Sequence, residues 1–238
     1  MLVAAAVCPC PPLLVPAVAA GAAPELDAAR KACADALGVL AAARPDRLVV
    51  VGVADGPGAG PRPEGARGSF RGFGVDLEVR LGRGGTPQAA ARTLPPSLAV
   101  AAWLLEHSDW TDAPVEALGV DETQAPERCL AAGRELAAAP GRTALLVMGD
   151  ASACRSVKAP GYLDPRAEPF DAEVARALGA ADTAALAALD PELARELKAS
   201  GRACWQVLAG AAEGAGLTGT LHYDEAPYGV GYLVATWS

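Results

Sequence analysis

The chain has 238 residues, of which 52% are hydrophobic and 20% are charged, and its formal net charge is -8 at pH 7. This length and composition exclude a disordered chain and predict a globular domain with a sizeable core. The acidic balance supplies no basic stripe for a phosphate backbone, so we expect no nucleic-acid partner.

The opening stretch, residues 1–24, carries no charge and so raises the question of a secretory signal or a membrane anchor. No basic segment precedes it, and Pro9, Pro11, Pro12 and Pro16 would break a spanning helix. No other run reaches the ~18 apolar residues that a membrane span needs. We therefore expect a cytoplasmic chain with no membrane partner.

Four strand-like runs alternate with helical patterns in the first two thirds of the chain. The runs are Leu2 to Val7, Leu48 to Val53, Val115 to Val120 and Thr143 to Met148. Between them we expect helices over Pro24 to Ala43, Ser97 to Glu106 with Ser97 as its cap, and Gln124 to Ala138. Most of the runs are almost continuously apolar, which is typical of strands covered on both faces. The pattern predicts a layered α/β/α fold with a mostly parallel sheet.

Other segments complete the expected fold. The alternation in Val75 to Leu81 predicts an edge or antiparallel strand. Gly52 to Gly74 lacks periodicity and reads as a long loop, either functional or a disordered insert. The last third predicts four helices and then a strand pair: Phe170 to Leu178, Thr183 to Leu189 behind Asp182, Pro191 to Ala199 behind Asp190, Ala203 to Glu213, Thr218 to Tyr223 and Val230 to Trp237. No linker or repeat interrupts residues 1–238, so we expect one domain.

Reactive residue types gather where the predicted strands end. Cys8 and Cys10 end or follow the first strand, Asp55 follows the second, and Asp150 and Cys154 follow the fourth. Ligands of α/β folds bind at the carboxyl edge of the sheet, where these turns would converge. The sequence therefore predicts a small-molecule pocket at this edge.

Two kinds of chemistry fit these residues, and each has a structural alternative. Cysteine and aspartate are ligand types for zinc or iron, but no C-x-x-C pair or H-x-x-x-H spacing is present, and buried inert thiols are the alternative. Nucleophilic attack by Cys10, Ser152 or Cys154 would need a base such as His222. A hydrogen-bonded strand histidine is the other interpretation of His222.

The segment from Lys158 to Asp171 is irregular, rich in charged and turn residues, and leads into a helix. Lys158, Tyr162 and Arg166 could bind an anionic or polar small molecule. Alternatively, this is a helix-entry loop in which Asp164 and Glu168 pair with the arginines.

Several segments, spread over almost the whole chain, resemble the class III extradiol ring-cleavage dioxygenase superfamily, the LigB-type fold shared with MEMO-like proteins. The matching segments are Cys10-Pro11-Pro12-Leu13-Leu14-Val15-Pro16, Val49 to Pro57, Gly149-Asp150-Ala151-Ser152, Gly161 to Asp171 with its Asp-Pro-Arg-Ala-Glu-Pro-Phe-Asp, and Ala226-Pro227-Tyr228-Gly229-Val230-Gly231-Tyr232. The two C-terminal segments are the most specific of these.

The resemblance implies a non-heme ferrous site of two histidines and a carboxylate, with open positions for a catechol and dioxygen. In this chain the first ligand position falls on Cys10, the second on Asp55, and a further expected histidine is Ala153. The carboxylate corresponds to Glu225 or Asp224. Because the imidazole donors are replaced, we do not expect ordinary catechol cleavage.

Three functions remain open under this resemblance. The first is an oxidoreductase with an altered metal, iron or zinc, bound by Cys10, Asp55 and Glu225. The second is a metal-free enzyme that uses the same pocket, and the third is a non-catalytic, MEMO-like scaffold or regulator. A homo-oligomer is also possible if Trp110 and Trp237 meet a second copy. The expected pocket lining is Cys8, Cys10, Asp55, Asp150, Ser152, Cys154, Lys158, Tyr162, Arg166, His222, Glu225 and Tyr228.

Overall fold

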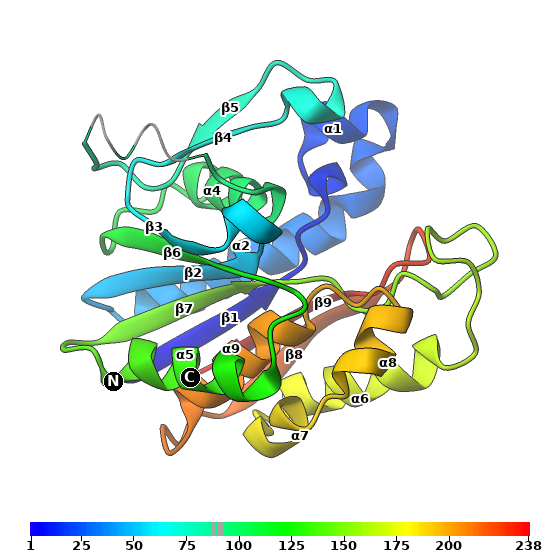
Figure 1. Ribbon diagram of the computed structural model, residues 1–238. Helices are drawn as coiled ribbons and strands as arrows, with labels where there is room; N and C mark the ends of the chain where they lie inside the picture. Colours follow the sequence, from blue (N-terminus) through cyan, green and yellow to red (C-terminus); the bar gives the residue numbers. More distant parts are fainter. Residues whose placement is uncertain (87–88, 90–92) are drawn as a thin grey trace.

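A seven-stranded sheet forms the centre of the computed structural model, which describes residues 1–86, 89 and 93–238 (Figure 1). The strand order is β3-β6-β2-β7-β1-β9-β8. Four adjacent strands run parallel: β6 (Val115–Val120), β2 (Arg47–Val53), β7 (Thr143–Met148) and β1 (Leu2–Cys8). The antiparallel strands β3 (Gly60–Arg62), β9 (Tyr232–Trp237) and β8 (Gly219–Glu225) complete the sheet. The predicted layered α/β fold with a C-terminal strand pair is confirmed.

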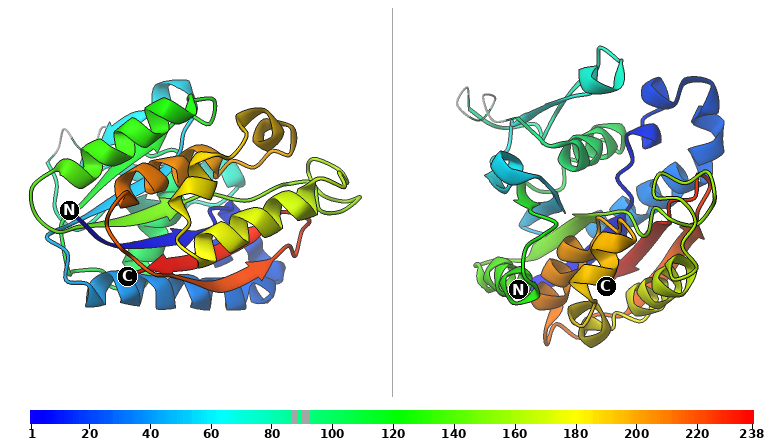
Figure 2. Two further views of the ribbon diagram at one scale, coloured as in Figure 1. Left: turned by 90° about the horizontal axis from the view of Figure 1, so that it is seen from below. Right: turned by 45° about the vertical axis from the view of Figure 1, so that its right-hand side comes forward.

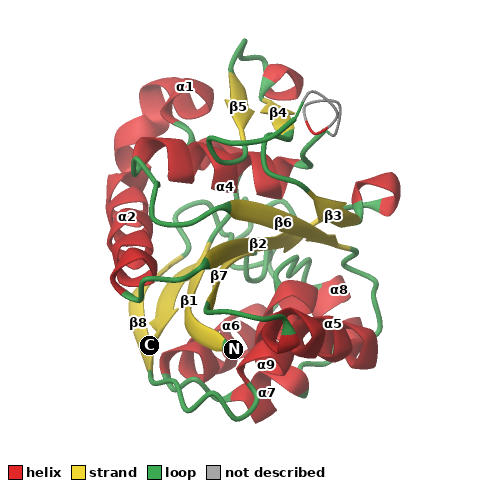
Figure 3. Cartoon of the chain, turned by 90° about the vertical axis from the view of Figure 1, so that its left-hand side faces the viewer, coloured by secondary structure: helices red, strands yellow, loops and turns green. Residues whose placement is uncertain are grey.

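Helices cover both faces of this sheet, which explains why its central strands are almost wholly apolar (Figures 2 and 3). The first face packs against α2 (Asp27–Ala42) and α4 (Pro96–His107). The second face packs against α5 (Pro126–Ala138), α6 (Ala167–Gly179) and α9 (Arg202–Ala212). All six residues of β7 are buried.

Alternate residues of each strand enter two separate cores. Leu48 and Val50 of β2 belong to the core on the α2 face, whereas Val49 and Val51 belong to the core on the α9 face. Trp110 and Trp237 are also buried in these cores, and each indole N–H donates to a backbone carbonyl of its own chain. Trp110 and Trp237, which the sequence left open as contacts with a second copy, thus pack inside their own chain.

Short elements connect the main ones. They are η1 (Pro12–Leu14), α1 (Pro16–Ala19), η2 (Ala20–Leu26), η3 (Gly56–Gly58), η4 (Arg71–Phe73), α7 (Thr183–Ala187) and α8 (Pro191–Glu196). As predicted, Asp182 and Asp190 cap α7 and α8 through their side chains.

The starts of α2 and α4 differ from the sequence prediction for local reasons. Pro24 lies inside the 3-10 turn η2, so α2 begins only at Asp27. Ser97 lies inside α4 rather than capping it, and its hydroxyl donates to the carbonyl of Val53 at 2.5 Å. This bond ties α4 to the carboxyl end of β2.

The segment expected to be one long loop, residues 52–74, contains short regular elements. Besides η3, β3 and η4 it holds β4 (Arg67–Ser69), which pairs antiparallel with β5 (Glu78–Arg80). The antiparallel strand predicted within Val75 to Leu81 is thus confirmed in shorter form. Gly68 of β4 packs closely on Ala99, so this small sheet lies against α4 (Figure 1).

Among the described residues, no helix combines the length and apolar character required to cross a membrane.

Candidate functional site

Asp150 and Cys10 meet at the carboxyl edge of the sheet, where the parallel neighbours β7 and β1 end. The backbone N–H of Cys10 donates to Oδ1 of Asp150 at 2.8 Å. The strand register pairs Cys8 with Met148, so Cys10 and Asp150 lie two residues beyond a matched pair. Tyr232, the first residue of β9, continues this row on the other side of β1. Three adjacent strands therefore contribute a carboxylate, a thiol and a phenol at one level of the sheet.

The thiols of this site lie on the face of the sheet that α2 covers. Cys8 and Cys10 belong to the same core as Cys33 of α2, and all three are buried. A hydrogen bond between the thiols of Cys33 and Cys8, together with burial, raises the pKa of Cys33. Because Cys33 belongs to α2, this contact joins the helix to the end of β1.

Burial makes the carboxyl group of Asp150 a weaker acid. Loss of solvation raises the pKa of its carboxyl to about 7, although the N–H of Cys10 opposes this shift. The charge of Asp150 in turn raises the pKa of Tyr232, for which burial is the larger cause. A carboxyl group that titrates near neutral pH beside a protonated phenol can exchange a proton with a bound molecule.

The cysteines predicted as reactive are protonated and shielded. Burial, followed by the charge of Asp150, raises the pKa of Cys10 well above its usual value. Burial also raises the pKa of Cys154, whose thiol lies 3.4 Å from the carbonyl of Leu197. Because the thiolate is the attacking form, neither environment favours a nucleophile.

Ser152 is engaged in a structural contact rather than paired with a histidine. Its backbone N–H and its hydroxyl both donate to the buried carboxylate of Asp171, each at 2.8 Å. Arg155 donates to the same carboxylate at 3.1 Å. These bonds fix the Gly-Asp-Ala-Ser turn to the first turns of α6.

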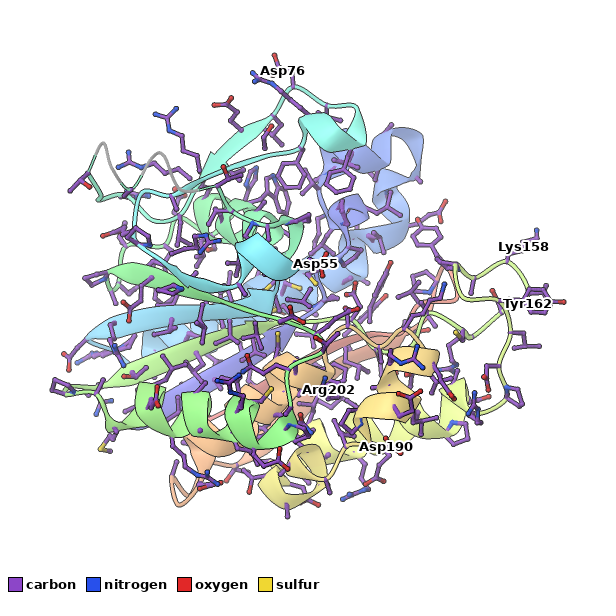
Figure 4. All side chains as sticks on the ribbon, viewed as in Figure 1. Asp55, Asp76, Lys158, Tyr162, Asp190 and Arg202 are labelled. Carbon is purple, nitrogen blue, oxygen red and sulfur yellow. The ribbon has the colours of Figure 1, made fainter. Side chains whose placement is uncertain are left out.

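The residues predicted to bind substrate on the loop before α6 lie apart from the Asp150 row. Lys158 and Tyr162 are exposed at the outer end of this loop (Figure 4). Arg166 is also exposed and pairs with Asp164 and Glu196, both at 2.7 Å. Arg166 thus pairs with Asp164, as expected if this segment is a helix-entry loop.

His222 and Tyr228 also have partners outside the row. Nε2 of His222 lies 2.7 Å from Oγ1 of Thr236, within hydrogen-bonding distance, and Thr236 is opposite Ala6 in the register. His222 is thus level with the interior of β1 and not with its carboxyl end. Tyr228 donates its hydroxyl to Oε2 of Glu25 at 3.0 Å, closing the β8–β9 hairpin against η2.

The predicted metal ligands are not assembled. The described residues form no group of three or more histidine, cysteine, aspartate or glutamate side chains that could hold a metal ion. β7 separates Asp55 from Cys10, and β9 separates Glu225 from Cys10, so each strand end is about 10 Å from that of β1. Asp55 and Glu225 are also exposed. A protonated, buried Cys10 between two distant carboxylates does not fit the ferrous site that the resemblance implies.

A cavity of about 380 Å³ lies next to the row, on the other side of the segment that joins α8 to α9. Gly201 donates to the backbone carbonyl of Asp150 at 2.9 Å, whereas Ala199 and Arg202 line the cavity. Its remaining walls come from α8, from Lys198 just after α8, and from Glu122 and Thr123 after β6. None of these residues was singled out from the sequence, since no motif marks them.

Comparisons with known proteins support the fold alone. No family model and no curated protein sequence matches the chain. Among solved structures, the chain is similar to the crystal structure of uncharacterized protein JW3007 from Escherichia coli K12. The identity is 15%, the TM-score is 0.53, and the match covers 99% of this chain and 100% of that one. This likeness extends over the whole α/β domain and carries no information on activity.

Proposed function

We propose that this protein is an enzyme that binds a small hydroxylated or carbonyl compound at the carboxyl edge of the sheet and exchanges a proton with it through Asp150. The observation that carries the proposal is the hydrogen bond from Cys10 to Asp150, which fixes this carboxylate where β7, β1 and β9 converge. Ligand sites of open α/β sheets lie at this edge.

The roles of the neighbouring residues follow from their protonation. Burial raises the pKa of Asp150 to about 7, which suits an acid or base that must act in both directions. Tyr232 keeps its proton and can donate a hydrogen bond to a ligand oxygen. Cys10 holds Asp150 through its backbone rather than through its thiol. We assign no step to a metal, because the candidate ligands do not fit one.

Catechol is the probe for this proposal because it combines an aromatic ring with two hydroxyl groups. We expect Asp150→Asn to weaken catechol binding by at least about 10-fold in calorimetry, the usual effect of losing a hydrogen bond to a charged group. The matched control is Asp55→Asn, an exposed aspartate after the neighbouring strand. Equal binding by both variants would contradict the assignment.

Oxygen uptake separates this proposal from ring cleavage. With ferrous iron and catechol in air, we expect no consumption of dioxygen above the rate without protein. Uptake of one dioxygen per catechol, with appearance of a ring-opened product, would instead support the dioxygenase chemistry of the resembled superfamily and would overturn the proposal.

One observation favours a second function, that of a MEMO-like scaffold. Val157, Tyr162 and Leu163 are large, exposed and apolar, and they lie together on the loop before α6. Exposed apolar groups on a projecting loop are typical of a protein-binding surface. Tyr162→Ser with Leu163→Ser tests it: loss of a partner in pull-downs, with catechol binding intact, would favour the scaffold.

We also propose a cytoplasmic location. All six cysteines are free, and this is typical of chains that fold in a reducing compartment. Detection of the mature chain outside the cell by fractionation would contradict it.

A further inference from the structure

The cavity beside α8 and α9, here called the α8–α9 pocket, has the size of a small-molecule site. Its volume is about 380 Å³, within the usual range for ligand pockets. It opens between the Glu122–Thr123 turn after β6 and the facing helix α8, and Arg202 at the start of α9 lines it. Neither Cys10, Asp150 nor Tyr232 lines this pocket, so it is separate from the site proposed above.

Arg202 is a buried cation whose protein partners are all neutral. The residue is 3% exposed. Its guanidinium donates to the carbonyl of Gln124 at 2.7 Å, to Oε1 of Gln206 at 2.9 Å and to the backbone carbonyl of Glu122. Arg202 also interacts with the thiol of Cys129. Burial raises the pKa of this thiol more than Arg202 lowers it, so the thiol stays protonated and neutral.

A buried charge without a counter-ion is costly, which makes this arrangement unusual. The carbonyls fix the guanidinium in place at the pocket wall, but they do not neutralise it. Arg202 forms no ion pair with any residue that the structure describes. An anionic ligand in the pocket would supply the missing charge.

The other charges of the pocket select the kind of anion. Lys198 lies on the wall, and its amino group donates to the carbonyl of Pro160 at 3.5 Å and forms no ion pair among the residues that the structure describes. Glu192 and Arg195 pair with each other and so offset one another. Glu122 adds one negative charge, which would repel a dianion such as phosphate more strongly than a monoanion.

The apolar residues of the pocket wall favour a ligand with a compact apolar body. The lining also includes the small apolar side chains of Pro191, Ala194 and Ala199. A ligand with one carboxylate and a compact apolar body would place its charge on Arg202 and Lys198 and its body against these residues.

We infer that the α8–α9 pocket binds a small organic monocarboxylate, held by Arg202 and Lys198. Three carbonyl groups already orient the guanidinium, so the side chain of Arg202 loses little conformational entropy when a ligand binds. This inference does not depend on the function proposed for Asp150.

Benzoate is the probe that tests the inference, with benzamide as its neutral isostere and inorganic phosphate as the competing anion. We expect benzoate to shift the amide resonances of Thr123, Ala199 and Arg202 in two-dimensional NMR, and to bind more tightly than either control. Shifts confined to Cys10 and Asp150 would place benzoate in the other site and overturn the inference.

Variants then identify the groups that hold the carboxylate. Arg202→Gln should weaken benzoate binding by about 10-fold or more, because it removes a charge-assisted contact in a buried position. Lys198→Gln should weaken it by about two- to five-fold, since solvent screens the charge of this exposed lysine. Lys158→Gln, an exposed lysine outside the pocket, is the matched control and should bind as the wild type does.

Three results would each overturn the inference. They are benzamide binding as tightly as benzoate, phosphate binding more tightly than benzoate, and unchanged benzoate affinity in Lys198→Gln. If Arg202→Gln fails to fold, Lys198→Gln against Lys158→Gln still decides the matter. An absence of benzoate binding at 10 mM, about the weakest affinity of interest for so small a ligand, would also overturn it.

Discussion

Ser152 and Asp171 form a two-point contact in which both donors of the serine meet both oxygens of the carboxylate. The distances are 2.8 Å from the backbone N–H and 2.8 Å from the hydroxyl, and the aspartate is 1% exposed. Burial raises the pKa of Asp171, while these bonds and Arg155 lower it. The contact joins the turn after β7 to the first turns of α6, so it holds one wall of the carboxyl edge in place.

Replacement of Asp171 should destabilise the protein. In Asp171→Asn the amide cannot accept both bonds from Ser152 and no longer pairs with Arg155, so we expect the free energy of unfolding to fall by about 2–4 kcal/mol. Urea unfolding measures this. Glu168→Gln is the control, because Glu168 pairs with the same Arg155 at 3.7 Å but its side chain is 79% exposed. Its change should stay within about 0.5 kcal/mol, and similar losses in both variants would contradict the argument.

Asp150 should make stability depend on pH in a defined direction. Its pKa is about 7 in the folded chain and near 3.8 when solvated, so the folded state binds the extra proton between these values. The free energy of unfolding therefore falls as pH rises from about 4 to 7, by at most about 1.4 kcal/mol per pH unit, and this contribution is constant above the folded pKa.

Asp150→Asn isolates this contribution from those of the other titrating groups. Relative to the wild type, the variant should gain stability as pH increases from 4 to 7, measured by urea unfolding at each pH. Asp55→Asn serves as the control, since Asp55 is exposed after the neighbouring strand. Parallel curves for Asp150→Asn and the wild type would show that burial does not perturb Asp150.

The sequence was sufficient for the layers of the fold but not for the neighbours at its edge. Continuous apolar runs predicted the buried strands, and the turn residues placed Cys10, Asp55 and Asp150 at one edge. Which of them meet depends on strand order, and β7 lies between β1 and β2. Asp150 therefore contacts Cys10, whereas Asp55 does not.

Register and packing explain the remaining differences. His222 was expected near the crevice, but its contact with Thr236 places it level with Ala6. Arg202 carried no recognisable motif, because its partners are backbone carbonyls of a distant turn and the side chain of Gln206. The backbone carbonyls involve atoms that every residue possesses, so no residue pattern reports these two contacts.

The thiols should be unreactive in the folded chain. All six are buried, and burial contributes to raised pKa values for Cys10, Cys33, Cys129, Cys154 and Cys204. Only the thiolate attacks a disulfide reagent. We therefore expect the thiols to react with Ellman's reagent at pH 8 no faster than the protein unfolds. Six equivalents should react at once in guanidinium chloride. A fast single equivalent under native conditions that Cys10→Ala abolishes would contradict this and restore Cys10 as a reactive group.

The contact between α5 and α9 depends on glycine. A Cβ added to Gly133 would overlap the carbonyl oxygen of Val207 and lie 2.6 Å from the amide nitrogen of Ala211, so backbone would have to move. Gly133→Ala should therefore lower the free energy of unfolding by at least about 2 kcal/mol. Gly38→Ala is the matched control: Gly38 lies inside α2, is exposed, and would meet nothing within 4 Å. That variant should gain about 0.5–1 kcal/mol from helix propensity, so a loss of stability there, or none in Gly133→Ala, would contradict the packing described.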